Sequence, residues 1–163
     1  AAQGHGWTVY DAAGIRILVM NLLGTGFMEP LASPFETADA ILEKCRGGYD
    51  VALVDFHAEA TSEKLALARY LTGRVSAVWG THTHVATADC RILGGHTGFI
   101  TDLGMVGSAD GILGVKSEAV LQKFLVKTPV RFETEHGNEG ATGALFTVDS
   151  GSGKCISAES VSF

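Results

Sequence analysis

Two histidines separated by a single residue stand out in the stretch GTHTHV, residues 80–85, which directly follows the apolar run VSAVW. A third histidine, His57, follows the apolar run YDVALVDF in the same way. Neutral imidazole is a good ligand for zinc, iron, manganese or nickel, so the chemistry indicated is metal binding. Any one of these histidines alone is better explained as a solvent-facing loop residue. Three of them after two neighbouring apolar runs favour a metal site.

The elements that must position these histidines follow from the alternation of apolar runs with helical patterns. In chain order we expect a hairpin over residues 7–23, a helix over 33–46, a strand over 49–56, a helix from 61 or 62 to 71 and a strand over 75–79. The order strand, helix, strand, helix, strand predicts a parallel sheet with right-handed crossovers.

In such a sheet the ligand site lies beyond the carboxyl ends of the strands. His57 is expected at one of these ends, and His82 and His84 are expected just after the next. Residues i and i+2 of an extended segment point to the same side, so His82 and His84 are predicted to converge on one centre. Gly80 is expected to let the backbone bend as it leaves the sheet.

Acidic residues near these strand ends are candidates to support the site. Asp55 is expected to point to the same face of its strand as His57 and could orient a metal ligand. It could equally well cap a helix or be a buried acid whose hydrogen bonds are all made within the core. Glu59 is near enough to serve a substrate or a ligand, and Asp102, at the end of a further strand, is a second candidate with weaker support.

Two other charged residues, in the helix expected between these strands, are explained by the structure of the helix and not by the site. Glu63 is expected to favour the first turn of its helix through the helix dipole. Lys64, next to it, could contact a phosphate, but a surface charge explains it better.

The second half of the chain has a different pattern. CRILGGHTGFITDLG predicts a hairpin that turns at Gly94-Gly95, SEAVLQKFLV predicts a short helix, and residues 130–163 predict two or three antiparallel strands. The expected fold class is therefore α/β, with parallel strands followed by antiparallel C-terminal strands, in one domain that spans residues 1–163.

Composition limits the functions that this chain could have. Hydrophobic residues make up 46% of its 163 residues and charged residues 18%, which is typical of a compact globular protein. The net charge of −6 argues against stable nucleic-acid binding. The longest apolar stretch, residues 15–24, is too short to span a membrane, and AAQGHGW lacks the features of a signal peptide. Three widely spaced cysteines are typical of reduced thiols, so a cytoplasmic location is expected.

The motif GTHTH resembles the G-H-x-H block that closes the two-metal site of the calcineurin-like metallophosphoesterases, and His57 resembles the histidine of the block before it. The longer phrases VDFHAEATSEKLAL, GRVSAVWGTHTHVATADCRIL and ITDLGMVGSADGILG resemble one bacterial branch, the YmdB-type metallophosphoesterases. That branch is described as 2′,3′-cyclic-nucleotide 2′-phosphodiesterases. The resemblance runs from about Gly6 to the last residue.

This resemblance implies a four-layer α/β/β/α sandwich with two divalent metal ions, iron or manganese with zinc as an alternative, between the sheets. Two metals roughly 3.5–4 Å apart would clamp the phosphate of a small cyclic nucleotide and generate the attacking hydroxide. Carried over by motif, His57 and His82 would bind one metal and His84 the other.

The chain departs from the family in one respect. The G-D-x-x-G, Glu-Asn and Gly-Asn-His blocks of the family, which supply further ligands and the proposed proton donor, do not occur in it, and its asparagines are only Asn21 and Asn138. We therefore expect a C-terminal portion of a single metallophosphoesterase domain that is inactive alone. The alternative is a non-catalytic module that binds a metal or a partner. Self-association through an exposed strand would make it a homo-oligomer.

Overall fold

A hairpin opens the computed structural model, which describes residues 4–163. Strands β1 (Trp7–Ala12) and β2 (Ile15–Leu23) pair antiparallel through Ala13 and Gly14, and both turn residues have positive φ. Glycine adopts this conformation at no steric cost, which explains the tight connection. The predicted hairpin is confirmed.

The parallel part of the fold alternates strands with helices, as predicted. Its elements are β2, α1 (Pro34–Lys44), β3 (Val51–His57), α2 (Thr61–Leu71) and β4 (Ala77–Thr81). The hairpin β5 (Arg91–Leu93) and β6 (Thr97–Ile100) completes a six-stranded sheet in the order β1-β2-β3-β4-β6-β5, in which β2, β3, β4 and β6 run parallel.

Strand β4 starts and ends two residues later than predicted. Gly80 was expected to bend the chain away from the sheet, but it lies inside the strand and pairs with Phe56 of β3. The reason is steric: a Cβ at Gly80 would lie 1.8 Å from the backbone oxygen of Thr101. Glycine is used here for close backbone approach, so the strand continues to Thr81 beside His57.

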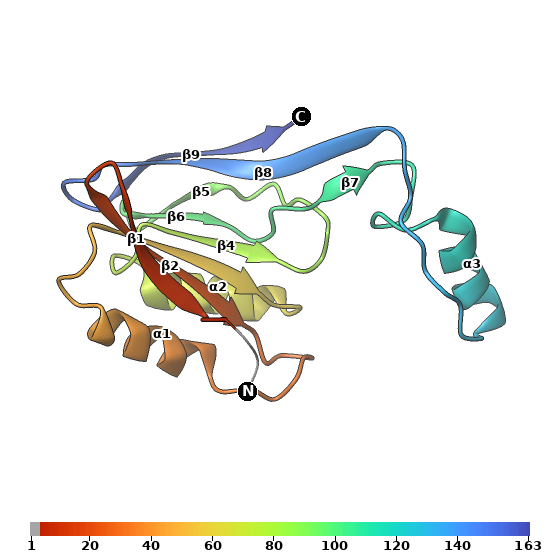
Figure 1. Cartoon of the computed structure of the whole chain (residues 1–163), viewed down its shortest axis with the longest axis horizontal. Helices are drawn as coiled ribbons and strands as arrows, with labels where there is room; N and C mark the ends of the chain where they lie inside the picture. The colour runs from red at the N-terminus through yellow and green to blue at the C-terminus, as the bar shows by residue number, and fades with distance from the viewer. Residues whose placement is uncertain (1–3) are drawn as a thin grey trace.

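Helices α1 and α2 cover one face of the large sheet (Figure 1). Alternate strand residues such as Met20, Val54 and Phe56 point toward them and are completely buried. The intervening residues, including Asp55 and His57, therefore point to the opposite face.

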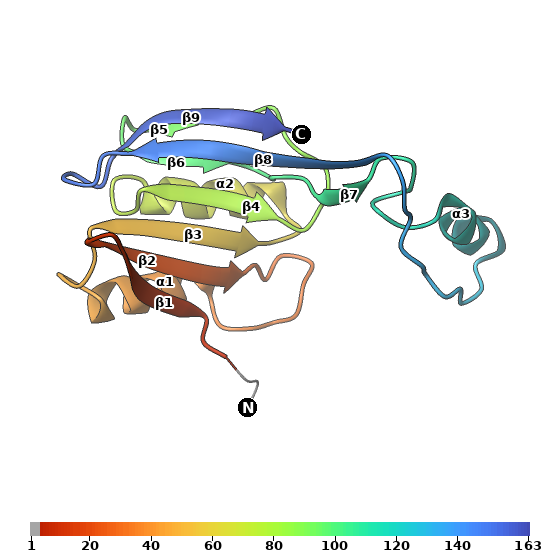
Figure 2. The same cartoon turned by 45° about the horizontal axis from the view of Figure 1, so that its top comes forward.

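A second, antiparallel sheet packs on part of that opposite face. It consists of β7 (Val106–Ser108), β8 (Glu139–Val148) and β9 (Cys155–Ser162), and β8 and β9 lie in front of β5 and β6 in Figure 2. Trp79 of β4 stacks on Phe146 of β8 with ring centroids 6.5 Å apart. The described residues thus form a helix layer, a mixed sheet and an antiparallel sheet. This α/β sandwich agrees with the predicted fold class.

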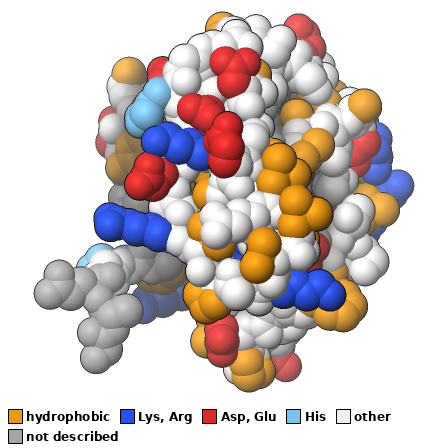
Figure 3. Space-filling model, turned by 90° about the vertical axis from the view of Figure 1, so that its right-hand side faces the viewer, with side chains coloured by type: hydrophobic (Ala, Val, Ile, Leu, Met, Phe, Trp, Pro, Cys, Tyr) orange, Lys and Arg blue, Asp and Glu red, His pale blue; other side chains and the backbone are white. Residues whose placement is uncertain are grey.

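Helix α3 (Ser117–Val126) lies apart from these layers, beyond the end of the sheets (Figures 1 and 2). Val120 is its only buried residue, and several apolar side chains of the helix are exposed. Figure 3 views this end of the molecule and shows hydrophobic side chains gathered beside charged ones. None of the helices in residues 4–163 is long and apolar enough to cross a membrane.

Candidate functional site

A chain of three polar side chains fixes the orientation of His57 at the end of β3. The Asn21 amide donates a hydrogen bond of 2.9 Å to Asp55. The Thr81 hydroxyl donates to the other Asp55 oxygen at 3.2 Å and lies 3.1 Å from Nδ1 of His57. Because the single hydroxyl proton is given to the carboxylate, Thr81 accepts from His57 Nδ1–H. Nε2 of His57 is therefore left with its lone pair free, as a metal ligand or proton acceptor requires.

His82 lies directly against this free nitrogen. Its Nδ1 is 3.0 Å from Nε2 of His57, and its Nε2 is 2.9 Å from a carboxylate oxygen of Glu59. Both contacts are hydrogen bonds only when the His82 ring carries two protons, and therefore a positive charge. The three side chains together place two imidazole rings and one carboxylate side by side at the ends of β3 and β4.

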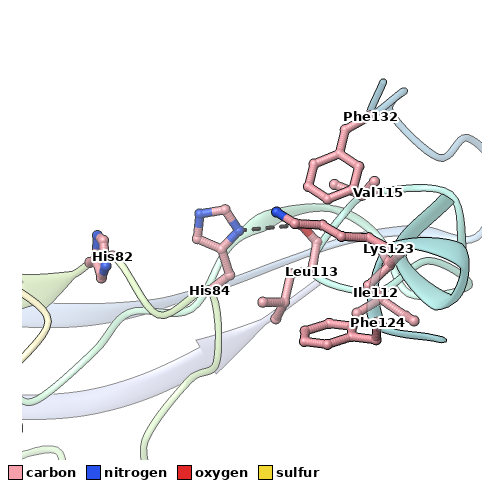
Figure 4. A pocket seen from close by; sticks show the side chains of 9 residues that line it. His82, His84, Ile112, Leu113, Val115, Lys123, Phe124 and Phe132 are labelled. Carbon is pink, nitrogen blue, oxygen red and sulfur yellow. Dashed lines mark hydrogen bonds between the residues drawn. The ribbon is translucent and has the colours of Figure 1, made fainter. Parts of the chain in front are cut away.

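His84 does not lie beside the other two histidines. His82 and His84 have φ values of 107° and 63°, so the segment after β4 is not extended and the expectation that alternate residues point the same way is wrong here. Nδ1 of His84 lies 3.3 Å from the carbonyl oxygen of Leu113, away from His82 (Figure 4). Within residues 4–163 no group of three or more His, Cys, Asp or Glu side chains is placed to hold a metal ion.

A buried ion pair contacts the histidine loop, the segment 82–84 that follows β4. Nζ of Lys64 is 2.8 Å from Asp102, and the two side chains are 1% and 0% exposed. Asp102 also accepts hydrogen bonds from the backbone N–H groups of Thr83 and Gly104, so it ties α2 to the residue between the two loop histidines. Burial raises the pKa of Asp102, but the hydrogen bonds from Lys64, Gly104 and Thr83 outweigh it and hold that pKa below its usual range.

Two sequence-based interpretations are corrected by this arrangement. Lys64 is not a surface charge, because the helical period places it on the buried face of α2 with Leu67, Ala68 and Leu71. That spacing is visible in the sequence and could have shown its burial. Glu63 does not serve the helix dipole alone: its carboxylate accepts hydrogen bonds from the backbone N–H groups of Thr25 and Gly26 and holds the loop after β2.

Sequence reasoning placed Asp55 and Glu59 near the site, and the structure puts both in contact with it, Asp55 through Thr81 and Glu59 directly with His82. It missed Thr81. The signal was its position in a parallel sheet: Thr81 is the cross-strand partner of His57, so its hydroxyl faces the same side.

Comparisons with known proteins match most of this chain. The sequence model of the family described as YmdB-like protein matches residues 1–161. A Bacillus subtilis protein named 2′,3′-cyclic-nucleotide 2′-phosphodiesterase is 44% identical over 97% of this chain and 60% of its own length. The chain thus spans about 60% of the length of that curated relative.

Two solved structures share the fold. A hypothetical protein from Thermus thermophilus superposes with a TM-score of 0.92 and 38% identity, over 98% of this chain and 62% of that one. A structure described as a novel phosphatase, from Mycoplasma pneumoniae, gives a TM-score of 0.90 and 34% identity, over 98% and 57%.

Proposed function

The chain belongs to the YmdB-like protein family, and we propose that its histidine cluster is part of a metal-dependent phosphodiesterase site for 2′,3′-cyclic nucleotides. The observation that carries the proposal is the meeting of His57 and His82 at the carboxyl ends of adjacent parallel strands, with ring nitrogens 3.0 Å apart. The names of the relatives, a cyclic-nucleotide phosphodiesterase and a phosphatase, support hydrolysis of a small phosphoester.

Two imidazole nitrogens of the proposed site are spaced as two ligands of one divalent cation would be. Two nitrogens bound to one ion at roughly 2.0–2.1 Å lie about 3.0–3.4 Å apart, depending on the coordination geometry. Nε2 of His57 and Nδ1 of His82 have this separation and face each other. Nδ1 of His84 contacts the Leu113 carbonyl, so Nε2 of that ring is the nitrogen that would bind a second ion. We infer iron or manganese as the natural metals, with zinc as an alternative.

Divalent ions bound here would polarise a phosphoryl oxygen and lower the pKa of a water molecule. The chain contributes the orientation of the ligands. Thr81 keeps His57 in the tautomer with a free Nε2, and Glu59 holds the outer nitrogen of His82. Asp102 fixes the loop backbone between His82 and His84.

Hydrolysis of 2′,3′-cyclic AMP by the complete gene product, loaded with Mn²⁺ or Fe²⁺ and followed by liquid chromatography, tests this function. We expect turnover that a chelator abolishes, and His82→Ala should lower the rate by about 100-fold, at the upper end of what loss of a metal-site partner costs. His136→Ala is the control, because His136 is exposed and lies away from the cluster. A metal-loaded protein that hydrolyses no phosphodiester or phosphomonoester would instead support the non-catalytic binding module.

Thr81→Val should weaken metal binding at the site without unfolding the protein. Valine has the shape of threonine but no hydroxyl, so His57 loses the acceptor that selects its tautomer. We expect the Mn²⁺ affinity, measured by calorimetry, to fall about 10-fold. The ¹⁵N spectrum of His57 should change from one tautomer to a mixture. Thr8→Val, an exposed position of β1, should change neither, and an unaltered tautomer in Thr81→Val would contradict the assigned hydrogen bonds.

A further inference from the structure

A pocket of about 350 Å³ opens between the histidine loop and the segment around α3. His82 and His84 line one end, and the rest is lined mainly by apolar side chains, among them Leu113, Phe124 and Phe132, together with Lys123. Figure 4 shows the two phenylalanine rings on either side of Leu113 and Lys123, with His84 facing them. The pocket and the candidate metal ligands therefore share one cavity.

Both aromatic rings are exposed to solvent to a large extent. Phe124 is 74% exposed and Phe132 is 45% exposed, although phenylalanine is usually buried. Nζ of Lys123 lies 4.8 Å from the centroid of the Phe132 ring, which holds a positive charge at the edge of the same surface. Two solvent-facing rings and a cation beside a histidine cluster are the groups that bind a flat, electron-rich ring system.

A nucleobase has this chemistry. It offers a π-face that stacks on aromatic side chains, a gain of about 5- to 150-fold in affinity per base, and ring nitrogen or carbonyl acceptors for an ammonium group. A pocket of this volume lies at the small end of the usual range for small-molecule sites. The other end of the cavity, with its histidines, suits the phosphate.

We propose that this pocket is the nucleobase subsite, in which the base stacks against Phe124 and Phe132 while the cyclic phosphate lies at His82 and His84. The proposal rests on the proposed phosphodiesterase function and names the part of the substrate that the α3 segment recognises. Because stacking tolerates every base, the subsite gives weak discrimination among the four bases, and Lys123 favours those with an acceptor on the edge that it reaches.

The deciding experiment compares two substrates with the complete gene product: 2′,3′-cyclic AMP and methyl riboside 2′,3′-cyclic phosphate, which lacks the base. In the double variant F124A/F132A we expect kcat/KM for the nucleotide to fall about 30-fold, and that for the base-free substrate to change less than 2-fold. L125A is the matched control, because Leu125 lies on the same helix, is 80% exposed and does not line the pocket.

Binding of adenosine, followed by NMR, separates failure of the subsite from failure of the proposed function. If the protein hydrolyses neither substrate but binds adenosine, and F124A/F132A abolishes that binding, the phosphodiesterase proposal fails and the base pocket remains. Equal losses on both substrates, or unchanged activity on the nucleotide, would overturn the subsite. So would a shift of F124A/F132A to a smaller oligomer by light scattering, which would assign the rings to a contact between copies.

Discussion

Asp102→Asn is expected to lower the free energy of unfolding by about 3–5 kcal/mol, because it leaves a charged lysine buried without a counter-charge. Lys64 is 1% exposed, and Asp102 is its only acidic partner in the part of the chain that the structure describes. A buried ammonium group without a partner must lose its proton or draw water into the core, and both cost free energy. The asparagine is nearly isosteric, so loss of volume does not contribute.

Urea denaturation at neutral pH measures this effect. Glu133→Gln is the matched control, since it neutralises the acid of an exposed pair with Lys116, and we expect a loss below about 1 kcal/mol. The double variant Lys64→Met with Asp102→Leu should recover most of the stability, because a buried pair replaced by apolar groups is often neutral. If Asp102→Asn and Glu133→Gln lowered the free energy of unfolding by the same small amount, the buried pair would not stabilise the fold as its geometry indicates.

The buried Lys64–Asp102 pair also predicts how the free energy of unfolding depends on pH. The folded-state pKa of Asp102 is lowered, so its stabilisation is complete above the ordinary aspartate pKa of about 3.9 and is lost as the pH falls through the folded value. The difference in unfolding free energy between wild type and Asp102→Asn should therefore be constant from pH 7 to about pH 5 and shrink below about pH 4. If this difference in unfolding free energy grew as the pH fell, the lowered pKa of Asp102 in the folded state would be contradicted.

Much of the fold could be predicted because its strands are apolar runs of the right length between helical patterns. Runs such as VALVDF, which is buried by the helices on one face, leave little ambiguity about a parallel strand. The strand ends were less certain, since Gly80 can either end a strand or allow close approach of another backbone. Only the position of Thr101 decides between these uses, and that position depends on the tertiary structure.

The site was predictable in its residue types and less so in its geometry. His57, His82, Glu59 and Asp55 do meet, since parallel strands bring their carboxyl ends to one edge. The separation of His84 could not be predicted, because two positive φ values in three residues are held by contacts with the distant Asp102 and Leu113. Assignment of the three histidines as metal ligands stays a prediction.

Gly80→Ala is expected to destabilise the protein by more than about 3 kcal/mol. The new Cβ would lie 1.8 Å from the Thr101 oxygen and 2.8 Å from Cδ of Lys64, and the backbone oxygen cannot rotate away. The methyl group must therefore push apart the ends of β4 and β6. That movement would also break the hydrogen bond from Leu103 N–H to the Gly80 carbonyl and pull Asp102 from Lys64.

Thermal and urea unfolding of Gly80→Ala, beside Gly143→Ala, separate this steric effect from the general cost of replacing glycine in a strand. A Cβ at Gly143 of β8 would meet only Val161 at 3.7 Å, an ordinary van der Waals contact, so that variant should stay close to wild type. The histidine loop begins two residues after Gly80, and metal affinity should fall together with stability in Gly80→Ala alone. If both variants had similar stability, β4 and β6 would not approach each other as closely as the strand register requires.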